Sequence, residues 1–186
     1  MNLKRILVIQ TAFLGDVILA SPIWENLHQQ FPEAQIDVVV KKGNEALLSE
    51  HAFLNQVYTF DKRQKLKNLW KLGKQLRQQR YELVINLQRF ASSGLLTFLT
   101  RAKESRGFQK NPLSFVYSKR FQHKLKEGWH EVDRNLQLIA DLVTQPKKRP
   151  QLYPTLSDIE KISSFQTSSY YCLAPTSVWF TKQAPK

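Results

Sequence analysis

The sequence predicts an α/β fold with a doubly wound parallel sheet over residues 1–145. Short apolar runs rich in β-branched residues alternate with longer segments of helical spacing, which is the pattern of βαβ units. Several of these runs are apolar throughout, as expected of parallel strands that are buried on both faces. The 42% hydrophobic content supplies a core for such a sheet.

The amino-terminal segment predicts a complete βαβ unit. "KRILVI" (4–9) is an apolar strand, and "GDVILASPIWENLHQQF" (15–31) has helical spacing that ends at Pro32. "QIDVVV" (35–40) is the next strand. A helix between two such strands implies a parallel pair with a right-handed crossover.

The following segments continue the alternation. The expected helices are a short one at 44–51, a basic one at 62–80, and two more at 92–102 and 130–143. The expected strands are 56–60, 81–87 and 105–108, and 109–127 is expected to be a loop-rich basic segment.

Closely spaced prolines then interrupt the pattern. We expect residues 146–165 to form a linker, or a strap along the domain edge, followed by a short helix with Ser157 as its N-cap. Residues 166–186 are expected to begin a second α/β domain whose remainder is absent. A strand at 170–174 without neighbours would favour aggregation or pairing with another chain.

The net charge is +13, from 28 basic and 15 acidic residues, and the excess is concentrated at 61–80 and 101–126. Such fields favour polyanions, namely nucleic acid, an anionic membrane surface or a phosphorylated substrate. A solvated helix face with a basic loop is the structural alternative.

Other features limit the class of protein. No apolar run is long enough for a membrane-spanning helix, and the start lacks the pattern of a secretory signal. Cys172 is the single cysteine, so an internal disulfide is excluded and a cytoplasmic protein is expected. We expect Cys172 to be buried and without a chemical role.

The turn after the first strand, "TAFLGD" (11–16), differs from a dinucleotide-binding turn. Such a turn needs several glycines so that the backbone can approach a pyrophosphate, whereas this one has Gly15 alone, followed by Asp16. Asp16 would repel a phosphate there. The sequence also has no P-loop, no cysteine–histidine metal spacing and no G-x-S-x-G motif.

Two hypotheses account for Asp16. An aspartate in the first turn of a helix caps free N–H groups and complements the helix dipole. A carboxylate at the carboxyl end of the first strand also lies where open α/β sheets bind ligands, and could accept a proton from a hydroxyl there. Both remain open on spacing alone.

Several stretches, in the order in which they occur along the chain, resemble the ADP-heptose:lipopolysaccharide heptosyltransferases of glycosyltransferase family 9. They are "ILVIQTAFLGDVILASPIWENLHQQF" and its continuation to "VYTFDK", "YELVINLQRFASSGLLTFLTRAKESRGF", "HEVDRNLQLI" and "LAPTSVWFTKQAP", which together span nearly the whole chain. The resemblance implies the GT-B architecture of two Rossmann-like domains. Residues 1–145 would be the acceptor-binding, N-terminal half, and 166–186 would begin the donor-binding domain.

The resemblance also implies an inverting transfer of heptose from ADP-heptose to the inner core of lipopolysaccharide, without a cofactor or a metal. Asp16 matches the proposed general base of the family. Gly15 would permit the tight turn, and Thr11 would help to form the acceptor site. The helix dipole stabilises a negative charge at this position.

The acceptor implied by the resemblance is a phosphate-bearing glycolipid at an anionic membrane, which places the protein in the cytoplasm, peripheral to the inner membrane. Its candidate contacts are Arg63, Arg89, Lys110, Arg120 and His130. His130 has an equally plain alternative as a helix cap or a core histidine.

The segment "PTSVWFTKQAP" matches the turn of the family that contacts the donor phosphates. Lys182 would meet the diphosphate and stabilise charge on the leaving ADP, with Thr176 and Ser177 in the turn. Thr176 stands where the family commonly has glycine, and Ala184 stands where it commonly has tryptophan. Because most of the donor domain is missing, we expect a truncated chain with little activity unless a C-terminal half is supplied.

Two other hypotheses need no catalysis. One is a basic module that binds anionic lipid or nucleic acid, with an affinity that falls steeply with salt. Nucleic acid is not the expected partner, because no helix-turn-helix pattern occurs and the aromatic residues are not interleaved with the basic runs. The other is a decayed gene product without function.

Overall fold

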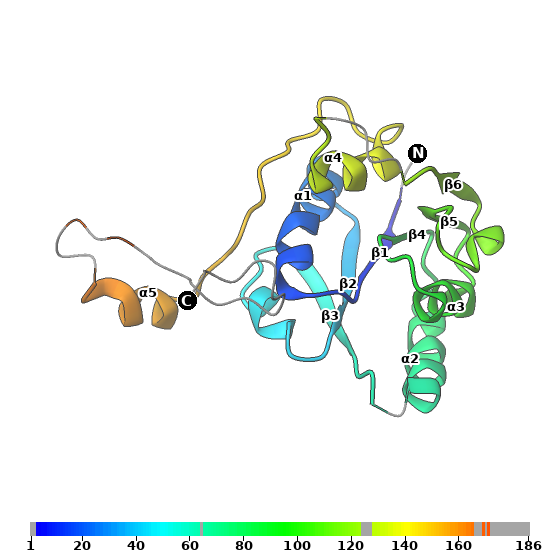
Figure 1. The fold of residues 1–186 in the computed structure, drawn as a ribbon, viewed down its shortest axis with the longest axis horizontal. Coiled ribbons are helices and arrows are strands. Elements are labelled where there is room, and N and C mark those ends of the chain that lie inside the picture. Colours follow the sequence, from blue (N-terminus) through cyan, green and yellow to red (C-terminus); the bar gives the residue numbers. More distant parts are fainter. Residues whose placement is uncertain (1–2, 64, 124–127, 166–168, 170, 172–186) are drawn as a thin grey trace, which may run out of the picture. The chain divides into compact units, whose positions relative to one another are not determined.

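The computed structural model describes residues 3–63, 65–123, 128–165, 169 and 171. The chain divides into two compact units, Met1–Tyr153 and Pro154–Lys186, which are treated separately. The first unit is built on a parallel sheet with helices on both faces, shown in Figure 1. The predicted doubly wound α/β fold is therefore confirmed.

The described sheet has the strand order β3-β2-β1-β4-β5-β6. All neighbouring strands are parallel. The strands are β1 (Arg5–Gln10), β2 (Gln35–Lys41), β3 (Leu54–Phe60), β4 (Leu83–Asn86), β5 (Glu104–Phe108) and β6 (Lys119–Phe121). β1 lies at the centre, where Val8 aligns with Val38 of β2 and with Ile85 of β4.

Two pairs of helices cover the sheet, as Figure 1 shows. α1 (Leu14–Gln30) and α4 (Glu131–Leu136) pack on one face, and α2 (Lys65–Gln78) and α3 (Ala91–Thr100) pack on the other. Alternate residues of β1 supply the two cores: Ile6 and Val8 face α1, whereas Leu7 and Ile9 face α2. Successive side chains of β1 point to opposite faces of the sheet and both faces are covered, which explains why Ile6–Ile9 are all apolar.

Three segments differ from the sequence-based expectation. Residues 109–127 contain a 3₁₀ turn, η2 (Ser114–Val116), and the short strand β6, which the sequence did not predict. The helix expected at 130–143 ends as α4 at Leu136, followed by the 3₁₀ turn η3 (Gln137–Ile139). A buried arginine of β5, Arg106, donates a hydrogen bond to the carbonyl oxygen of Leu138 at 2.9 Å. This carbonyl therefore bonds to a side chain of β5 and not to an N–H of a continuing helix. The short helix expected at 44–51 is the 3₁₀ turn η1 (Glu45–Leu48).

The proline-containing segment lies along α1 up to Tyr153. Asn26 exchanges two hydrogen bonds with the backbone of Lys147, each 2.8 Å long, and Ser21 accepts one from Gln151 N at 2.9 Å. These polar side chains of α1 therefore hold the segment as a strap.

In the second unit, α5 (Leu156–Ser163) begins two positions earlier than expected. Thr155 is the N-cap, and its Oγ1 accepts from Asp158 N at 3.0 Å. The prediction of Ser157 as the cap is wrong, because Thr155 and Asp158 form a reciprocal capping box. Cys172 and most of the strand expected at 170–174 lie outside the described residues.

Among the described residues, no helix has both the length and the apolar character needed to cross a membrane.

Candidate functional site

The strand order reverses between β1 and β4, and this reversal positions the candidate site. Chain connections leave β1 and β4 toward opposite faces of the sheet, so their carboxyl ends leave a crevice in which α/β proteins bind ligands. Ile9 and Asn86 align at these ends. The loops that follow, 11–13 and 87–90, therefore flank the crevice.

Asp16 lies beside this crevice at position N3 of α1. Its Oδ2 accepts a hydrogen bond from Phe13 N at 3.1 Å, so the capping role is present in the structure. Its backbone carbonyl accepts from Gln10 Nε2 at 3.3 Å, which ties the first turn of α1 to the end of β1. The carboxylate is half-buried. Capping through Oδ2 leaves Oδ1 for a second partner, so the role as a base stays a prediction.

Gly15 does not make the turn that we expected of it. It lies inside α1, has no positive φ, and a Cβ at this position would meet nothing within 4 Å. The change of direction occurs at Thr11–Phe13 instead, and Thr11 is buried at the end of β1. Gly15 thus leaves open space above the first turn of α1.

A buried amide network fixes the two loops relative to each other. Gln88 Nε2 donates to Gln10 Oε1 across the switch point. Asn86 Nδ2 donates to Thr97 Oγ1 and to Tyr117 OH, both at 2.9 Å. Burial raises the pKa of Tyr117, so its hydroxyl stays protonated. Because buried amides need these partners, the loops cannot shift without leaving polar groups unpaired.

Asn111 extends this network to the loop after β5. Its Nδ2 donates to the carbonyls of Gln88 at 3.1 Å and Phe90 at 2.9 Å, while its Oδ1 accepts from Leu113 N at 2.9 Å. Gly94 permits the approach, since a Cβ there would lie 2.5 Å from Asn111 Oδ1. One buried asparagine therefore holds two loops of the crevice.

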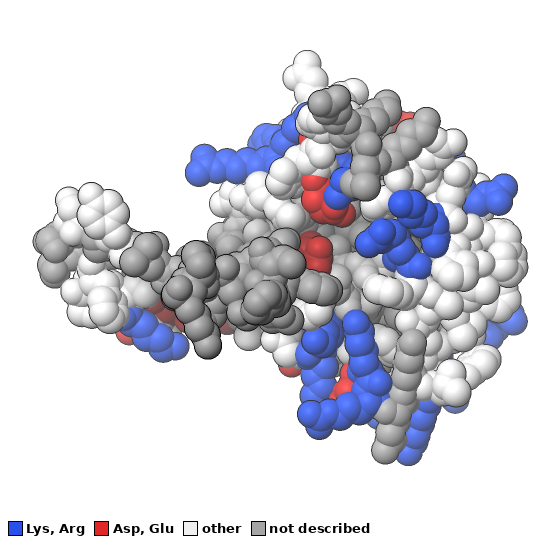
Figure 2. All heavy atoms as spheres, viewed as in Figure 1, with Lys and Arg blue, Asp and Glu red and all other residues white. Residues whose placement is uncertain are grey.

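Basic residues gather at the carboxyl ends of β2 and β3. They line a pocket of about 370 Å³ formed by Lys41, Lys42, Gly43, Glu45, Phe60, Asp61, Lys62 and Arg63. Figure 2 shows lysine and arginine side chains in several groups on this face, one of them in its lower central part. We call this group the basic pocket.

Arg63 is positioned in the basic pocket by its backbone. Its N–H donates to Asp61 Oδ1 at 2.9 Å, and its carbonyl accepts from Asn68 Nδ2 at 2.5 Å. Lys42 Nζ pairs with Asp61 Oδ2 at 3.2 Å. The hydrogen bond from Arg63 N and the ammonium of Lys42 lower the pKa of Asp61. Arg63 was predicted from the resemblance, whereas Lys41 and Lys42 were not singled out.

A second group of positive charges surrounds His123. Burial lowers the pKa of His123, and the nearby charges of Arg89, Arg134 and Lys110 lower it further. Arg134 also forms an ion pair with Glu131. The structure thus brings together the predicted Arg89 and Lys110 with His123 and Arg134, which the sequence did not indicate.

The other predicted contacts have different positions. His130 is the N-cap of α4, where its Nδ1 accepts from Val132 N at 3.3 Å, so the capping alternative holds. Arg120 lies in the edge strand β6, aligned with Gly107 of β5, and its side chain is exposed. Lys182, Thr176 and Ser177 lie outside the described residues. Within the described ranges, no group of three acidic, histidine or cysteine side chains could hold a metal ion.

Comparison with known proteins identifies the family. The sequence model of glycosyltransferase family 9 (heptosyltransferase) matches residues 69–186. The chain belongs to this family. Its curated relatives in family 9 include lipopolysaccharide heptosyltransferase 3 of Escherichia coli K12, which is 31% identical over 69% of this chain and 39% of the relative. Another is lipopolysaccharide heptosyltransferase 1 of Pseudomonas aeruginosa, 27% identical over 76% of this chain and 43% of the relative. The chain spans less than half the length of these relatives.

Solved structures show the same fold. A family 9 glycosyl transferase from Veillonella parvula superposes with a TM-score of 0.78 at 21% identity, over 90% of this chain and 51% of that one. ADP-heptose lipopolysaccharide heptosyltransferase II of E. coli gives a TM-score of 0.69 at 24% identity, over 89% and 51%. The described sheet is therefore the Rossmann-like fold of these GT-B glycosyltransferases.

Proposed function

We propose that this chain provides the acceptor side of an inverting heptosyltransferase that transfers heptose from ADP-heptose to the inner core of lipopolysaccharide. Membership in family 9 supports the reaction class, and the curated relatives are named as lipopolysaccharide heptosyltransferases. The observation that carries the proposal is Asp16, a half-buried carboxylate beside the switch-point crevice.

In the proposed reaction, Asp16 takes the proton of the attacking acceptor hydroxyl. The hydroxyl oxygen forms a bond to the anomeric carbon of heptose as the bond from that carbon to the ADP oxygen breaks. ADP leaves with the electron pair, and a single displacement inverts the anomeric carbon. This step needs the acceptor hydroxyl within hydrogen-bond reach of the Asp16 carboxylate.

Phosphates and other anions of the acceptor are proposed to bind two sets of basic residues, the basic pocket and the residues around His123, at the carboxyl ends of the strands (the carboxyl edge of the sheet). Arg63 in the basic pocket and Arg89 with Lys110 around His123 lie after different strands, so they could contact separate phosphates of one glycolipid. Arginine suits this task because its planar fork binds phosphate through two donors. Contacts of His130, which caps α4, and of the exposed Arg120 with the acceptor are proposed from the resemblance alone.

Lys182, Thr176 and Ser177 are proposed to bind the donor phosphates. The relatives have more than half their length outside the matched region, so turnover is proposed to need a donor-binding portion beyond the described unit. The transfer of heptose is proposed to occur in the cytoplasm, at the anionic surface of the inner membrane.

The test compares Asp16→Asn with Glu33→Gln, an exposed carboxylate in the turn between α1 and β2. Acceptor binding is measured by calorimetry with heptose-deficient lipopolysaccharide. Turnover is measured by ADP release in each variant after a donor-binding portion has been supplied. We expect Asp16→Asn to bind acceptor normally and to lower turnover about 10²–10⁴-fold. Glu33→Gln should match the parent in both.

Three results would contradict the proposal. Equal turnover in Asp16→Asn would leave Asp16 as a cap alone. If the folded parent chain does not bind the acceptor, the proposed acceptor site is wrong. Binding that falls steeply with salt and does not distinguish acceptor from other polyanions would favour the non-catalytic basic module.

A further inference from the structure

The helix α2 exposes a second apolar surface in addition to the one that it buries. Leu69, Leu72 and Leu76 pack into the core against the sheet. Leu66 and Trp70, which lie one turn apart on another side of the helix, are 70% and 59% exposed. The core does not account for this second stripe.

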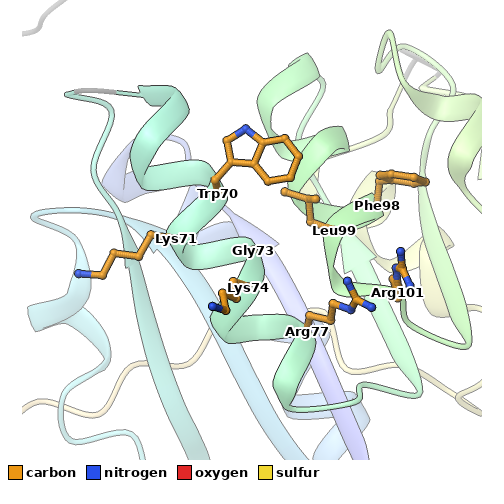
Figure 3. Close-up of a pocket in the computed structure, with 8 residues that line it drawn as sticks. All are labelled: Trp70, Lys71, Gly73, Lys74, Arg77, Phe98, Leu99 and Arg101. Atoms are coloured by element: carbon orange, nitrogen blue, oxygen red, sulfur yellow. The ribbon is translucent and has the colours of Figure 1, made fainter.

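Phe98 of α3 adds to the same surface, and it is 58% exposed. α2 and α3 approach closely at Gly73, where a Cβ would lie 2.6 Å from Leu99 Cδ1 and 2.9 Å from Leu99 Cβ. Because the helices touch there, the two helices together line an open groove of about 620 Å³. Figure 3 shows Trp70 and Leu99 facing each other across the groove.

Positive charge surrounds the groove. Its lining includes Lys71, Lys74, Arg77 and Arg101. Figure 3 shows Arg77 and Arg101 close together at one end of the groove, with the aromatic side chains toward the other. The segments 65–78 and 91–100 contain no aspartate or glutamate. Trp70 lies within the basic run 61–80, and folding places Phe98 beside the same basic residues.

We propose that this α2–α3 surface (Leu66, Trp70, Phe98, Lys71, Lys74, Arg77 and Arg101) docks on an anionic lipid bilayer. Aromatic and leucine side chains would enter the interface between headgroups and acyl chains. Arg77 and Arg101 lie at one end of the groove, whereas Lys71 projects from α2 away from Leu99 (Figure 3). The basic side chains would place their charges at the lipid phosphates around the inserted apolar residues. The all-positive border matches an anionic membrane.

The position of the surface is compatible with the candidate site. α2 begins directly after the segment that contains Arg63 and the basic pocket. Docking through α2 and α3 would leave the α1 face away from the bilayer and hold the basic pocket near the headgroups. The inference deepens the proposed function, on which it rests for the membrane-bound acceptor, but binding to lipid alone requires no acceptor.

The experiment measures cosedimentation of the whole chain with vesicles that contain no lipopolysaccharide. Vesicles of phosphatidylcholine are compared with vesicles of phosphatidylcholine and phosphatidylglycerol. We expect binding only to the anionic vesicles, and at least a roughly ten-fold loss of affinity in a Trp70→Ala, Phe98→Ala double variant. Phe115→Ala, which removes an exposed aromatic of the β5–β6 segment, is the matched control.

A second pair of variants tests the charges. Lys71→Gln with Lys74→Gln should weaken binding to anionic vesicles about 25-fold, since each basic residue near the surface contributes about five-fold. Lys147→Gln with Arg149→Gln makes the same change in net charge within the strap and should change affinity less than about two-fold. Circular dichroism and thermal melting confirm that each variant is folded.

Fluorescence reports whether Trp70 itself enters the lipid. The parent should show a blue shift with anionic vesicles, whereas Trp70→Phe should bind nearly as well and lose most of the shift. The proposal is overturned if the folded chain does not bind these vesicles, or if the double variant binds them as well as the parent. It is also overturned if the groove instead binds an oligonucleotide or a second copy of the chain.

Failure of this inference can be distinguished from failure of the proposed function. The Trp70 and Phe98 variants are expected to retain calorimetric binding of detergent-dispersed acceptor, which depends on the crevice. Loss of vesicle binding with retained acceptor binding assigns the surface to the membrane. Loss of acceptor binding in Asp16→Asn, or its absence in the parent, would contradict the proposed acceptor site and would leave the membrane surface untouched.

Discussion

The ammonium group of Lys41 lies over the ring of Phe13, with Nζ 5.3 Å from the ring centroid. Lys41 ends β2, and Phe13 donates its backbone N–H to Asp16. This cation–π contact therefore joins the basic pocket to the loop that precedes the proposed base. Any anionic ligand near Asp16 would lie within the field of Lys41.

Lys41→Met should weaken acceptor binding about 10-fold or more, because a charge-assisted contact to a phosphate is lost from a site beside Asp16. Calorimetry at low salt measures the change. Lys103→Met, which removes a cation paired with Glu82 outside the crevice, is the control and should leave affinity unchanged. Equal affinities in Lys41→Met and the parent would exclude Lys41 from the acceptor site.

Gly15→Ala should separate folding from ligand binding. The added Cβ meets nothing in the protein, so the variant should gain about 0.5–1 kcal/mol in unfolding free energy through better helix propensity. Acceptor affinity should fall, because the methyl group occupies space at the start of α1. Gly43→Ala should instead lose about 1–2 kcal/mol, since Gly43 has a φ of 98°. Undiminished acceptor affinity in Gly15→Ala would place the ligand away from this turn.

Arg106→Met should strongly destabilise the first unit. The buried guanidinium donates to Glu104 Oε1 at 2.6 Å and to both carboxylate oxygens of Asp141. Removing it leaves Glu104 and the half-exposed Asp141 without their main partner, at a cost of about 1.5–3 kcal/mol in urea unfolding. Lys119→Met, which removes a half-exposed partner of Asp141, should cost less than about 1 kcal/mol. Similar costs for the two variants would contradict this account.

Asp141 should make stability depend on pH in the acid range. Burial raises its pKa, but the hydrogen bonds from Arg106 and Lys119 outweigh burial and lower it to about 2, below the ordinary 3.8. A carboxyl with a lowered folded pKa stabilises the protein above its unfolded pKa, and this contribution is lost as pH falls from 3.8 toward 2. Asp141→Asn should flatten the stability profile in that window, and an unchanged slope would contradict this assignment.

Tyr81→Phe should destabilise the sheet by leaving a buried carboxylate short of a partner. Tyr81 OH donates to Asp37 Oδ2 at 2.5 Å, and Asn55 Nδ2 donates to Asp37 Oδ1 at 2.7 Å. Loss of the hydroxyl should cost about 1–3 kcal/mol in chemical denaturation. Tyr171→Phe, at a position 98% exposed, is the control and should leave unfolding unchanged. A neutral effect of Tyr81→Phe would mean that Asp37 gains another donor.

The interior elements of the fold could be predicted because their own residues specify them. β1 and β2 have mostly apolar, buried interiors, and the leucine spacing of α2 matches the face that it buries. β6 could not be predicted, since this edge strand is short, polar and exposed and its pairing with β5 is long-range. The early end of α4 likewise depends on Arg106, a residue distant in sequence.

The candidate site could be predicted only in part. The resemblance indicated Asp16, Arg63, Arg89 and Lys110, and the structure places them at the carboxyl edge. His123 and Arg134 had no local signal, because their proximity to Arg89 arises from the folding of α4 against the sheet. The tight turn before α1 was assigned to Gly15, but Gly15 lies inside the helix and the chain changes direction before it.

The amide contact between Gln10 and Gln88 has a consequence for biosynthesis. The two residues are 78 positions apart, and β1 acquires its second neighbour only when β4 is made. A nascent chain that has emerged through β3 would hold β1 with one open, apolar edge, which is a template for pairing with other chains. The crevice and the protection of that edge therefore arise together during translation, and a ribosome stalled before residue 88 would carry neither.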